Sequence, residues 1–357
     1  RATMNLRNTL PGTRRTPWLA AWLAAALHLV SPPAQAALGL TELPARGEDG
    51  PVTVYYPTDA AESPLSLGNG RLTLQVARDA PPGPGNGRLV AISHGSGGSP
   101  WVHADLARAL VEAGYTVVLP RHHADNFMDP SRPGPDSWER RPGEVSRAID
   151  ALGADGRFAP RLNLQRVGVF GMSAGGHTAL TLAGGRWSPA LFSRHCEQHL
   201  AEDFPACVGL FTQLDGSMLD GLKLWLARRV LRWTFTDATP QQHHDPRVAA
   251  VVAAVPHAAS FDVASFTSPR VPLALATAAG DVWLHPRFHS DRVLQACSGC
   301  EVIEAPAGAG HGAFLSPLPN GISGLEGRLL NDPPGFDRRA MPDVHRRIVA
   351  FFDRHLG

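Results

Sequence analysis

The stretch RVGVFGMSAGGH, residues 166–177, contains the pattern that decides the fold. Its first half, residues 166–170, is an apolar run that predicts a buried strand, and a helical pattern follows it. Between them, small residues flank Ser173, so a tight strand-to-helix turn can lift the hydroxyl clear of the sheet edge and place it at a helix N-terminus. The stretch predicts a nucleophilic serine; the alternative is a glycine-rich turn with an incidental serine.

The same alternation of strand, loop and helix continues on both sides of this turn. Runs that predict strands lie at 52–56, 71–76, 89–93, 115–120, 248–255, 273–277 and 301–304, and helical patterns lie at 103–113, 144–152, 287–296 and 344–355. The first two strands predict an antiparallel entry to the sheet. The later alternation indicates parallel crossover units, and hence an α/β fold whose mostly parallel central sheet has helices on both faces.

A serine hydroxyl needs a base to remove its proton and a carboxylate to orient that base. His311, in the sequence GAGHGAF at 308–314, is the best placed of the 16 histidines because it lies on a loop after the last predicted strand. Asp281 follows the strand at 273–277, so it can meet a histidine from the next loop. Asp262 and Asp215 remain alternatives for the acid.

A tetrahedral oxyanion needs hydrogen-bond donors that are fixed in advance. The sequence HGSGG at 94–98 follows a predicted strand and offers backbone N–H groups without side-chain obstruction. We expect the N–H of Ser96, or of a neighbouring glycine, to act with the N–H of Ala174. His94 is expected to brace this loop.

Three apolar residues near the expected site predict the walls of a substrate cleft: Met172, Trp283 and Phe314. The other histidines have simpler interpretations. His177, on the helix after Ser173, is expected to pack or to support the site from behind. The pairs His122-His123 and His243-His244 could be metal ligands, but neither has a companion at ligand spacing, so solvated loop histidines are expected and no metal site is predicted.

The segment 186–246 interrupts the alternation of strands and helices, because it is too long for an ordinary connection between them. Apolar positions at helical spacing occur at 219–233. The segment is interpreted as a cap over the active site. The alternative is a surface excursion that a Cys196–Cys207 disulfide staples.

Four cysteines allow three pairings. Proximity in the sequence favours Cys196 with Cys207 and Cys297 with Cys300. The alternative for the sequence CSGC at 297–300 is a redox dithiol or half of a zinc site. A redox pair normally opens a helix after a strand, whereas this one follows a helical stretch, and no second C-x-x-C is present to complete a zinc site.

Residues 1–36 have the pattern of a secretory signal peptide. Arginines at 7, 14 and 15 precede an apolar run at 18–30, and Ala34-Gln35-Ala36 forms a cleavage site. The run is shorter than the roughly 20 residues that span a bilayer, so a membrane anchor is the weaker alternative. We expect a secreted or periplasmic domain at 37–357, with no integral membrane segment after cleavage.

The composition excludes several classes of protein. Hydrophobic residues make up 43% of the chain and charged residues 18%, which is typical of a folded domain and not of a disordered one. Thirty-three basic residues against 32 acidic ones leave a net charge of +1. A nucleic-acid partner is therefore not expected.

The motifs at 94–98, 171–177, 280–281 and 310–311 together resemble those of the α/β-hydrolase superfamily, specifically its secreted dienelactone-hydrolase-like and platelet-activating-factor-acetylhydrolase-like branch. The resemblance spans residues 50–317, and the arrangement is also similar to that of cutinase-like polyester hydrolases. It implies a Ser-Asp-His chain order and a serine ester hydrolase that forms an acyl-enzyme. The implied substrate is a small-molecule or polymeric ester, and no metal or organic cofactor is implied.

Two features depart from that branch. Dienelactone hydrolases proper use a cysteine nucleophile, whereas this chain has Ser173, and the segment 186–246 is absent from the minimal pattern. A serine peptidase or amidase on the same fold, or a non-catalytic ligand-binding relative, are the alternative functions. Assays of amides against esters distinguish the first alternative.

Overall fold

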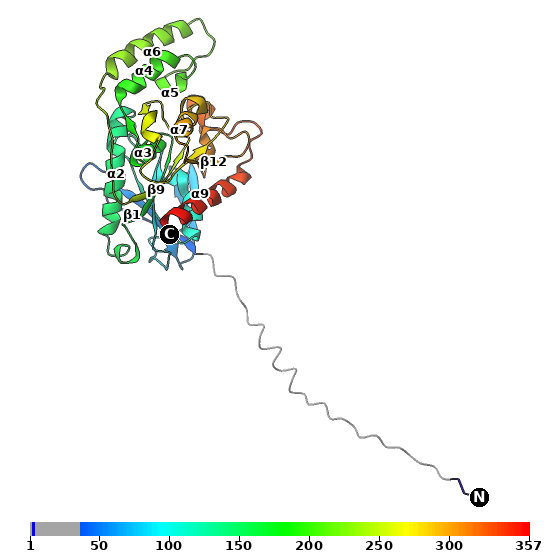
Figure 1. Cartoon of the computed structure of the whole chain (residues 1–357). Helices are drawn as coiled ribbons and strands as arrows, with labels where there is room; N and C mark the ends of the chain where they lie inside the picture. The colour runs from blue at the N-terminus through cyan, green and yellow to red at the C-terminus, as the bar shows by residue number, and fades with distance from the viewer. Residues whose placement is uncertain (1, 4–35) are drawn as a thin grey trace. The chain divides into compact units, whose positions relative to one another are not determined.

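The structure is a computed structural model that describes residues 2–3 and 36–357. The predicted signal peptide falls almost entirely outside the described residues and stays a prediction. Residues 36–357 form one compact unit, and Figure 1 shows its helices arranged around a central sheet.

Within residues 36–357, ten strands form the central sheet. In sheet order they are β12 (Glu301–Glu304), β11 (Leu273–Thr277), β9 (Val248–Ala254), β7 (Val167–Met172), β5 (Leu89–Ser93), β6 (Thr116–Pro120), β2 (Val52–Thr58), β1 (Ala37–Leu43), β4 (Leu72–Arg78) and β3 (Ser63–Leu67). The run from β12 to β6 is parallel throughout. The predicted α/β fold with a mostly parallel central sheet is therefore confirmed.

The entry to the sheet differs from the prediction in one respect. The two early predicted strands, β2 and β4, do not pair with each other, because the unpredicted β1 lies between them. β1 is antiparallel to β2 but parallel to β4, and β4 pairs antiparallel with the edge strand β3.

The helices cover both faces of the sheet. They are α1 (Ala104–Glu112), α2 (Pro135–Gly153), α3 (Ala174–Leu182), α4 (Pro189–His199), α5 (Phe204–Val208), α6 (Asp220–Thr234), α7 (Ser290–Ala296), α8 (Gly324–Leu330) and α9 (Met341–Leu356). Short 3-10 helices are η1 (Pro100–His103), η2 (Ala159–Arg161), η3 (Val263–Phe266), η4 (Pro286–Phe288), η5 (His311–Phe314) and η6 (Arg338–Ala340). One core packs α2, α3 and α7 on one face, and a second core packs α1 and α9 on the other.

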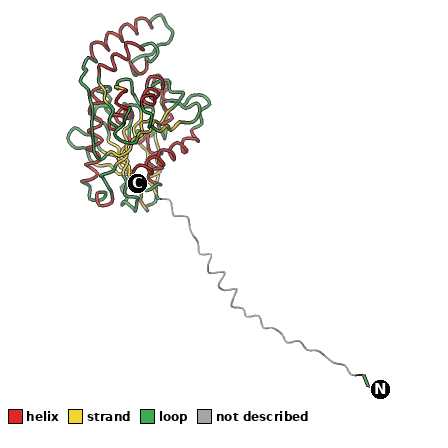
Figure 2. The backbone as a smooth tube through the Cα atoms, viewed as in Figure 1, coloured by secondary structure: helices red, strands yellow, loops and turns green. Residues whose placement is uncertain are grey.

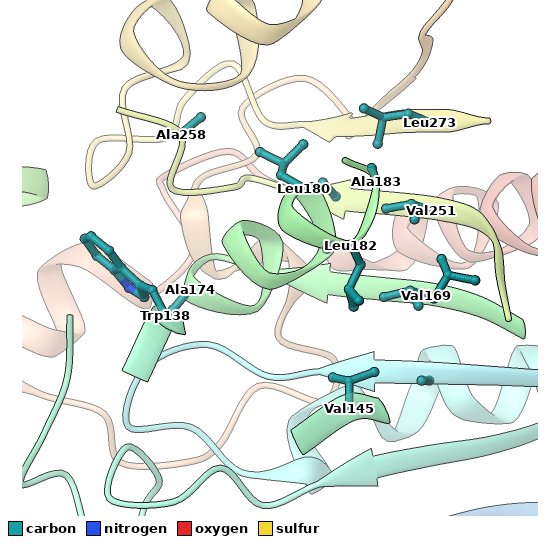
Figure 3. Close-up of a cluster of buried hydrophobic side chains, with 14 of the residues drawn as sticks. Trp138, Val145, Val169, Ala174, Leu180, Leu182, Ala183, Val251, Ala258 and Leu273 are labelled. Carbon is teal, nitrogen blue, oxygen red and sulfur yellow. The ribbon is translucent and has the colours of Figure 1, made fainter. Parts of the chain in front are cut away.

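The strands β5, β6, β7 and β9 are buried along nearly their whole length because helices cover both faces of a parallel sheet. Figure 3 shows the first core, in which Val169 and Val251 of neighbouring strands lie beneath Leu180 and Leu182 of α3. On the other face, close packing requires Gly168, since a Cβ at this position would lie 2.8 Å from the Phe352 ring of α9.

The segment 186–246 is mostly helical. It contains α4, α5 and α6, and it begins with β8 (Arg186–Trp187), which pairs with β10 (Phe261–Asp262) beyond the segment. The three helices lie together beyond one end of the sheet, at the top of Figure 1, and Figure 2 shows the loops that join them. Whether the segment acts as a cap over an active site is a functional question that this placement leaves as a prediction.

Both disulfides expected from sequence proximity are present, so the predicted pairing is confirmed. Cys196 of α4 is bonded to Cys207 of α5, and Cys297 is bonded to Cys300 between α7 and β12. No helix in the described part of the chain has both the length and the apolar character needed to cross a bilayer.

Candidate active site

Ser173 lies in a sharp turn between β7 and α3. Its backbone has φ +59° and ψ −117°, a conformation that glycine adopts readily and other residues avoid. The turn is closed by hydrogen bonds from the Ser173 N–H to the carbonyl of Ala254 and from the His257 N–H to the carbonyl of Ser173. Val255, between these two partners, also has a positive φ, +35°. Strained residues of this kind concentrate at functional sites.

The glycines beside Ser173 are required by close backbone contacts. A Cβ on Gly171 would lie 1.9 Å from the carbonyl oxygen of Gly175, and a Cβ on Gly175 would lie 1.9 Å from the carbonyl oxygen of Ser93. The small residues in the GMSAG pattern therefore have the steric role that the sequence predicts.

His311 and Asp281 are brought together by the loops after β12 and β11. His311 Nδ1 lies 2.7 Å from Asp281 Oδ2, and both side chains are buried. The other carboxylate oxygen, Asp281 Oδ1, accepts hydrogen bonds from the N–H groups of Trp283 and Leu284. An Nδ1–H donated to the fixed carboxylate leaves His311 Nε2 free to accept a proton.

The two alternative acids have other partners. Asp262 accepts from Arg186 and from the N–H of Ala264 at the start of η3. Asp215 is exposed and pairs with Lys223. Asp281 is thus the acid that the structure places beside His311.

Ser173 and His311 both follow the carboxyl ends of parallel strands, on the same edge of the sheet. β7, β9, β11 and β12 are consecutive parallel strands, so the residues that follow their carboxyl ends lie along one edge. Within residues 36–357 no hydrogen bond joins Ser173 Oγ to His311 Nε2. Such bonds commonly tighten only when substrate is bound.

The loop 94–98 passes beside Ser173. A Cβ on Gly95 would lie 3.4 Å from the Cβ of Ser173. Neither the Ser96 N–H nor the Ala174 N–H, at the start of α3, has an acceptor among the described residues, so both donors remain available. His94 Nδ1 contacts the Gly95 carbonyl at 2.8 Å, in keeping with the bracing role expected of this histidine.

A buried ion pair beneath this loop was not predicted. Asp125 Oδ1 accepts from the Ser96 hydroxyl at 2.6 Å and from the Gly97 N–H at 2.9 Å. Asp125 Oδ2 pairs at 2.8 Å with Arg141, whose guanidinium also donates to the carbonyls of His94 and Gly95. Burial opposes the ionisation of Asp125, but Arg141 and the Ser96 and Ser137 hydroxyls outweigh it and lower its pKa to about 2.

A second serine–histidine–carboxylate arrangement lies next to this ion pair. Ser93 Oγ is 2.7 Å from His122 Nε2, and His122 Nδ1 is 2.5 Å from Glu144 Oε2. All three side chains are buried. Burial, assisted by the nearby Arg141, lowers the pKa of His122 well below its ordinary value, so His122 is neutral at pH 7.

The prediction of a solvated histidine is therefore wrong for His122, because β6 ends in the interior and carries this residue beneath the 94–98 loop. His123 is part-exposed and contacts the carbonyl of Glu48, while His243 contacts Ser146. His177 packs on Trp138, as expected. Among the described residues, no group of three potential metal ligands is present.

The predicted cleft walls are only partly available to a ligand. Met172 and Phe314 lie in the hydrophobic core, with 1% and 4% of their surface exposed. Trp283 is part-exposed, and its ring lies 5.2 Å from that of His311. A further aromatic pair was not predicted from the sequence: Trp101 and Phe127, whose rings are 4.8 Å apart beside loop 94–98.

Phe127 is joined to loop 94–98 by a hydrogen bond from its N–H to the Gly98 carbonyl. The signal for this pair was the position of Trp101, three residues after the HGSGG motif.

Neither a family model nor a curated protein sequence matches the chain.

Proposed function

We propose that the protein is a secreted or periplasmic serine hydrolase of the α/β-hydrolase superfamily that cleaves carboxylic esters. The observation that carries this proposal is the strained Ser173 at the N-terminus of α3, on the sheet edge that also carries the His311–Asp281 pair. The parallel sheet and the motifs at 94–98 and 171–177 favour the dienelactone-hydrolase-like and platelet-activating-factor-acetylhydrolase-like branch. The substrate class is a small-molecule or polymeric ester.

The reaction proceeds in two stages. His311 Nε2 takes the hydroxyl proton of Ser173 while Ser173 Oγ attacks the ester carbonyl, and Asp281 stabilises the imidazolium that forms. His311 then gives the proton to the leaving alcohol, and an acyl-enzyme remains on Ser173. A water molecule, deprotonated by His311 in turn, attacks the acyl carbon; the acid leaves, and the proton returns to Ser173.

The developing oxyanion is stabilised by the N–H groups of Ser96 and Ala174. The Ser96 donor is held by its hydroxyl contact with Asp125, and the Ala174 donor by the start of α3, where the helix dipole also favours negative charge. Donors that need no rearrangement during the reaction are the ones that lower the barrier.

Two features support export. The two disulfides are of a kind that persists in oxidising compartments. The expected cleavage site ends at Ala36, and β1 begins at Ala37, so cleavage there leaves every strand of the sheet intact.

The test combines labelling with substrate comparison. A serine-directed fluorophosphonate should add one adduct, located on Ser173 by peptide mass spectrometry, and His311→Ala should slow this labelling severely. Acyl esters of graded chain length should be hydrolysed, and the matching anilides should be hydrolysed far more slowly. Preferential anilide turnover would favour a peptidase or amidase, and an unlabelled Ser173 with no turnover would favour a ligand-binding protein.

A further inference from the structure

The outer face of α6 is apolar and fully open to solvent. Five large side chains on this face are each more than half exposed: Leu222, Trp225, Leu226, Val230 and Trp233. Their spacing of three and four residues places them along one side of the helix. Isolated exposed apolar residues are common, but a contiguous patch that includes two tryptophans marks an interaction surface.

The apolar surface continues into the segment that precedes the helix. Phe211 is 90% exposed, Met218 is fully exposed and Leu219 is more than half exposed. We call Phe211, Met218, Leu219 and the five residues of α6 the outer apolar face.

Three exposed arginines lie on the same helix as the outer apolar face. Arg228, Arg229 and Arg232 are exposed, and the guanidinium of Arg229 lies over the Trp233 ring at 4.6 Å. Arg232 pairs with Glu197, whereas Arg228 and Arg229 form no ion pair with any residue that the structure describes. The face is therefore both apolar and positively charged.

The opposite side of α6 is already used for packing. Leu231 is the buried residue of the helix, and its carbonyl accepts a hydrogen bond from Ser193 of α4. Beneath α6, α4 is joined to α5 by the Cys196–Cys207 disulfide.

The buried carboxylate of Asp203 lies where this base meets α7. Asp203 Oδ2 lies 2.7 Å from His195 Nε2 in α4 and 3.2 Å from His289 Nε2 at the start of α7. α6 packs on this base through Leu231 and leaves its outer apolar face exposed.

We infer that the outer apolar face binds the surface of an anionic lipid bilayer. A helix with tryptophans and leucines on one face and arginines beside them lies in the interfacial plane, with the apolar side chains in the acyl boundary and the guanidinium groups among the phosphates. Two alternative occupants fit less well. A second copy of the chain would bring the same arginines toward one another in a two-fold contact, and a neutral polyester surface would leave them unpaired.

The experiment is co-sedimentation of the full chain with vesicles of phosphatidylcholine alone and of phosphatidylcholine with one-third phosphatidylglycerol. All variants keep the same N-terminal residues, so differences between them arise from the substitutions. Wild type should prefer the anionic vesicles. Trp225→Ser/Trp233→Ser should weaken binding about a hundredfold, and Arg228→Gln/Arg229→Gln should weaken binding to the anionic vesicles about thirtyfold while leaving the weak binding to neutral vesicles unchanged.

Val302→Ser is the matched control, because Val302 is an exposed apolar residue on the edge strand β12. It should bind like wild type, and circular dichroism should show that all variants are folded. Equal binding of wild type and the tryptophan variant, or no preference for anionic vesicles, would overturn the inference. So would a wild-type dimer that the tryptophan variant converts to a monomer. The readout is binding, so it stands or falls independently of ester hydrolysis.

Discussion

Two serine–histidine–carboxylate clusters lie along the same edge of the sheet, and the one with the more complete hydrogen bonds is not the one we propose to be catalytic. Ser93, at the end of β5, is bonded to His122, which is bonded to Glu144. Ser173 is followed along that edge by the bonded pair of His311 and Asp281, with no serine–histidine bond.

The difference between the clusters is in access and backbone geometry. Ser93 is a buried strand residue whose hydroxyl is already used, so neither a substrate nor an oxyanion donor can reach it. Ser173 is part-exposed, stands in a strained turn and lies beside two unused N–H donors. Hydrogen-bond distances alone therefore do not identify a nucleophile, and each cluster predicts a different response to mutation.

The largest expected effect separates the two serines. Ser173→Ala should reduce kcat for an activated ester on the order of a millionfold, because it removes the nucleophile. Ser93→Ala should leave kcat within a few-fold of wild type and lower the free energy of unfolding by about 1–2 kcal/mol, since His122 loses a buried partner. Ester assays and urea titrations measure both. Loss of turnover in a folded Ser93→Ala protein, with Ser173→Ala active, would exchange the two roles.

The two carboxylates should differ next. Asp281→Asn should lower kcat about ten-thousandfold, because an amide donates to His311 Nδ1 and favours the wrong tautomer. Glu144→Gln keeps an acceptor for His122 and should change kcat only a few-fold. The two variants are compared by ester hydrolysis at saturating substrate. A similar kcat for both would remove Asp281 from the mechanism.

The buried ion pair of Arg141 and Asp125, next to the Ser93–His122–Glu144 cluster, should contribute to the free energy of unfolding. Arg141→Met leaves the buried Asp125 carboxylate without its ion-pair partner and should lower the free energy of unfolding by about 3–5 kcal/mol. The double variant Asp125→Asn/Arg141→Met should recover much of that loss, because no unpaired charge remains. Urea denaturation measures both, and a loss below about 1 kcal/mol in the single variant would show that this pair does not stabilise loop 94–98.

The smallest expected effect concerns acid. Burial lowers the pKa of His122 well below its ordinary value of about 6.5, so as the pH falls below that value the unfolded chain binds a proton more readily than the folded protein does. Through this group the free energy of unfolding should therefore fall as the pH drops below about 6.5.

His122→Gln keeps a donor for Glu144 and an acceptor for Ser93 but does not titrate. Its free energy of unfolding should therefore fall less than that of wild type between pH 7 and pH 5, measured by urea titration at both values. Identical losses in the two proteins would mean that His122 is already protonated when folded.

The parallel strands could be predicted from the sequence because burial on both faces makes them continuous apolar runs. β3 could not, since Pro64 and exposed side chains give this edge strand no apolar pattern. α2 begins at Pro135, whereas the helical pattern in the sequence begins only at residue 144. The Pro142-Gly143 dipeptide within the helix resembles a helix break and conceals its first half. Tertiary packing of Trp138 and Arg141 overrides that local signal.

The proximity of Asp281 to His311 could be anticipated because residues after parallel strands share an edge. The buried pair of Arg141 and Asp125 could not be, since charged residues in polar sequence are exposed by default and spacing does not reveal an ion pair. Met172 and Phe314 were expected at a cleft because they lie near the proposed catalytic residues, but Met172 ends the buried strand β7 and Phe314 packs from η5 into the core.

At position 173 the backbone favours glycine, whereas the proposed chemistry requires the hydroxyl of a serine. A glycine there would relieve a left-handed conformation that costs about 1 kcal/mol or more, and would remove the hydroxyl at the same time. Selection for thermal resistance alone would thus drive this position toward an inert, sturdier protein. The serine at this unfavourable φ is therefore a trade-off, at one residue, between conformational stability and the proposed activity.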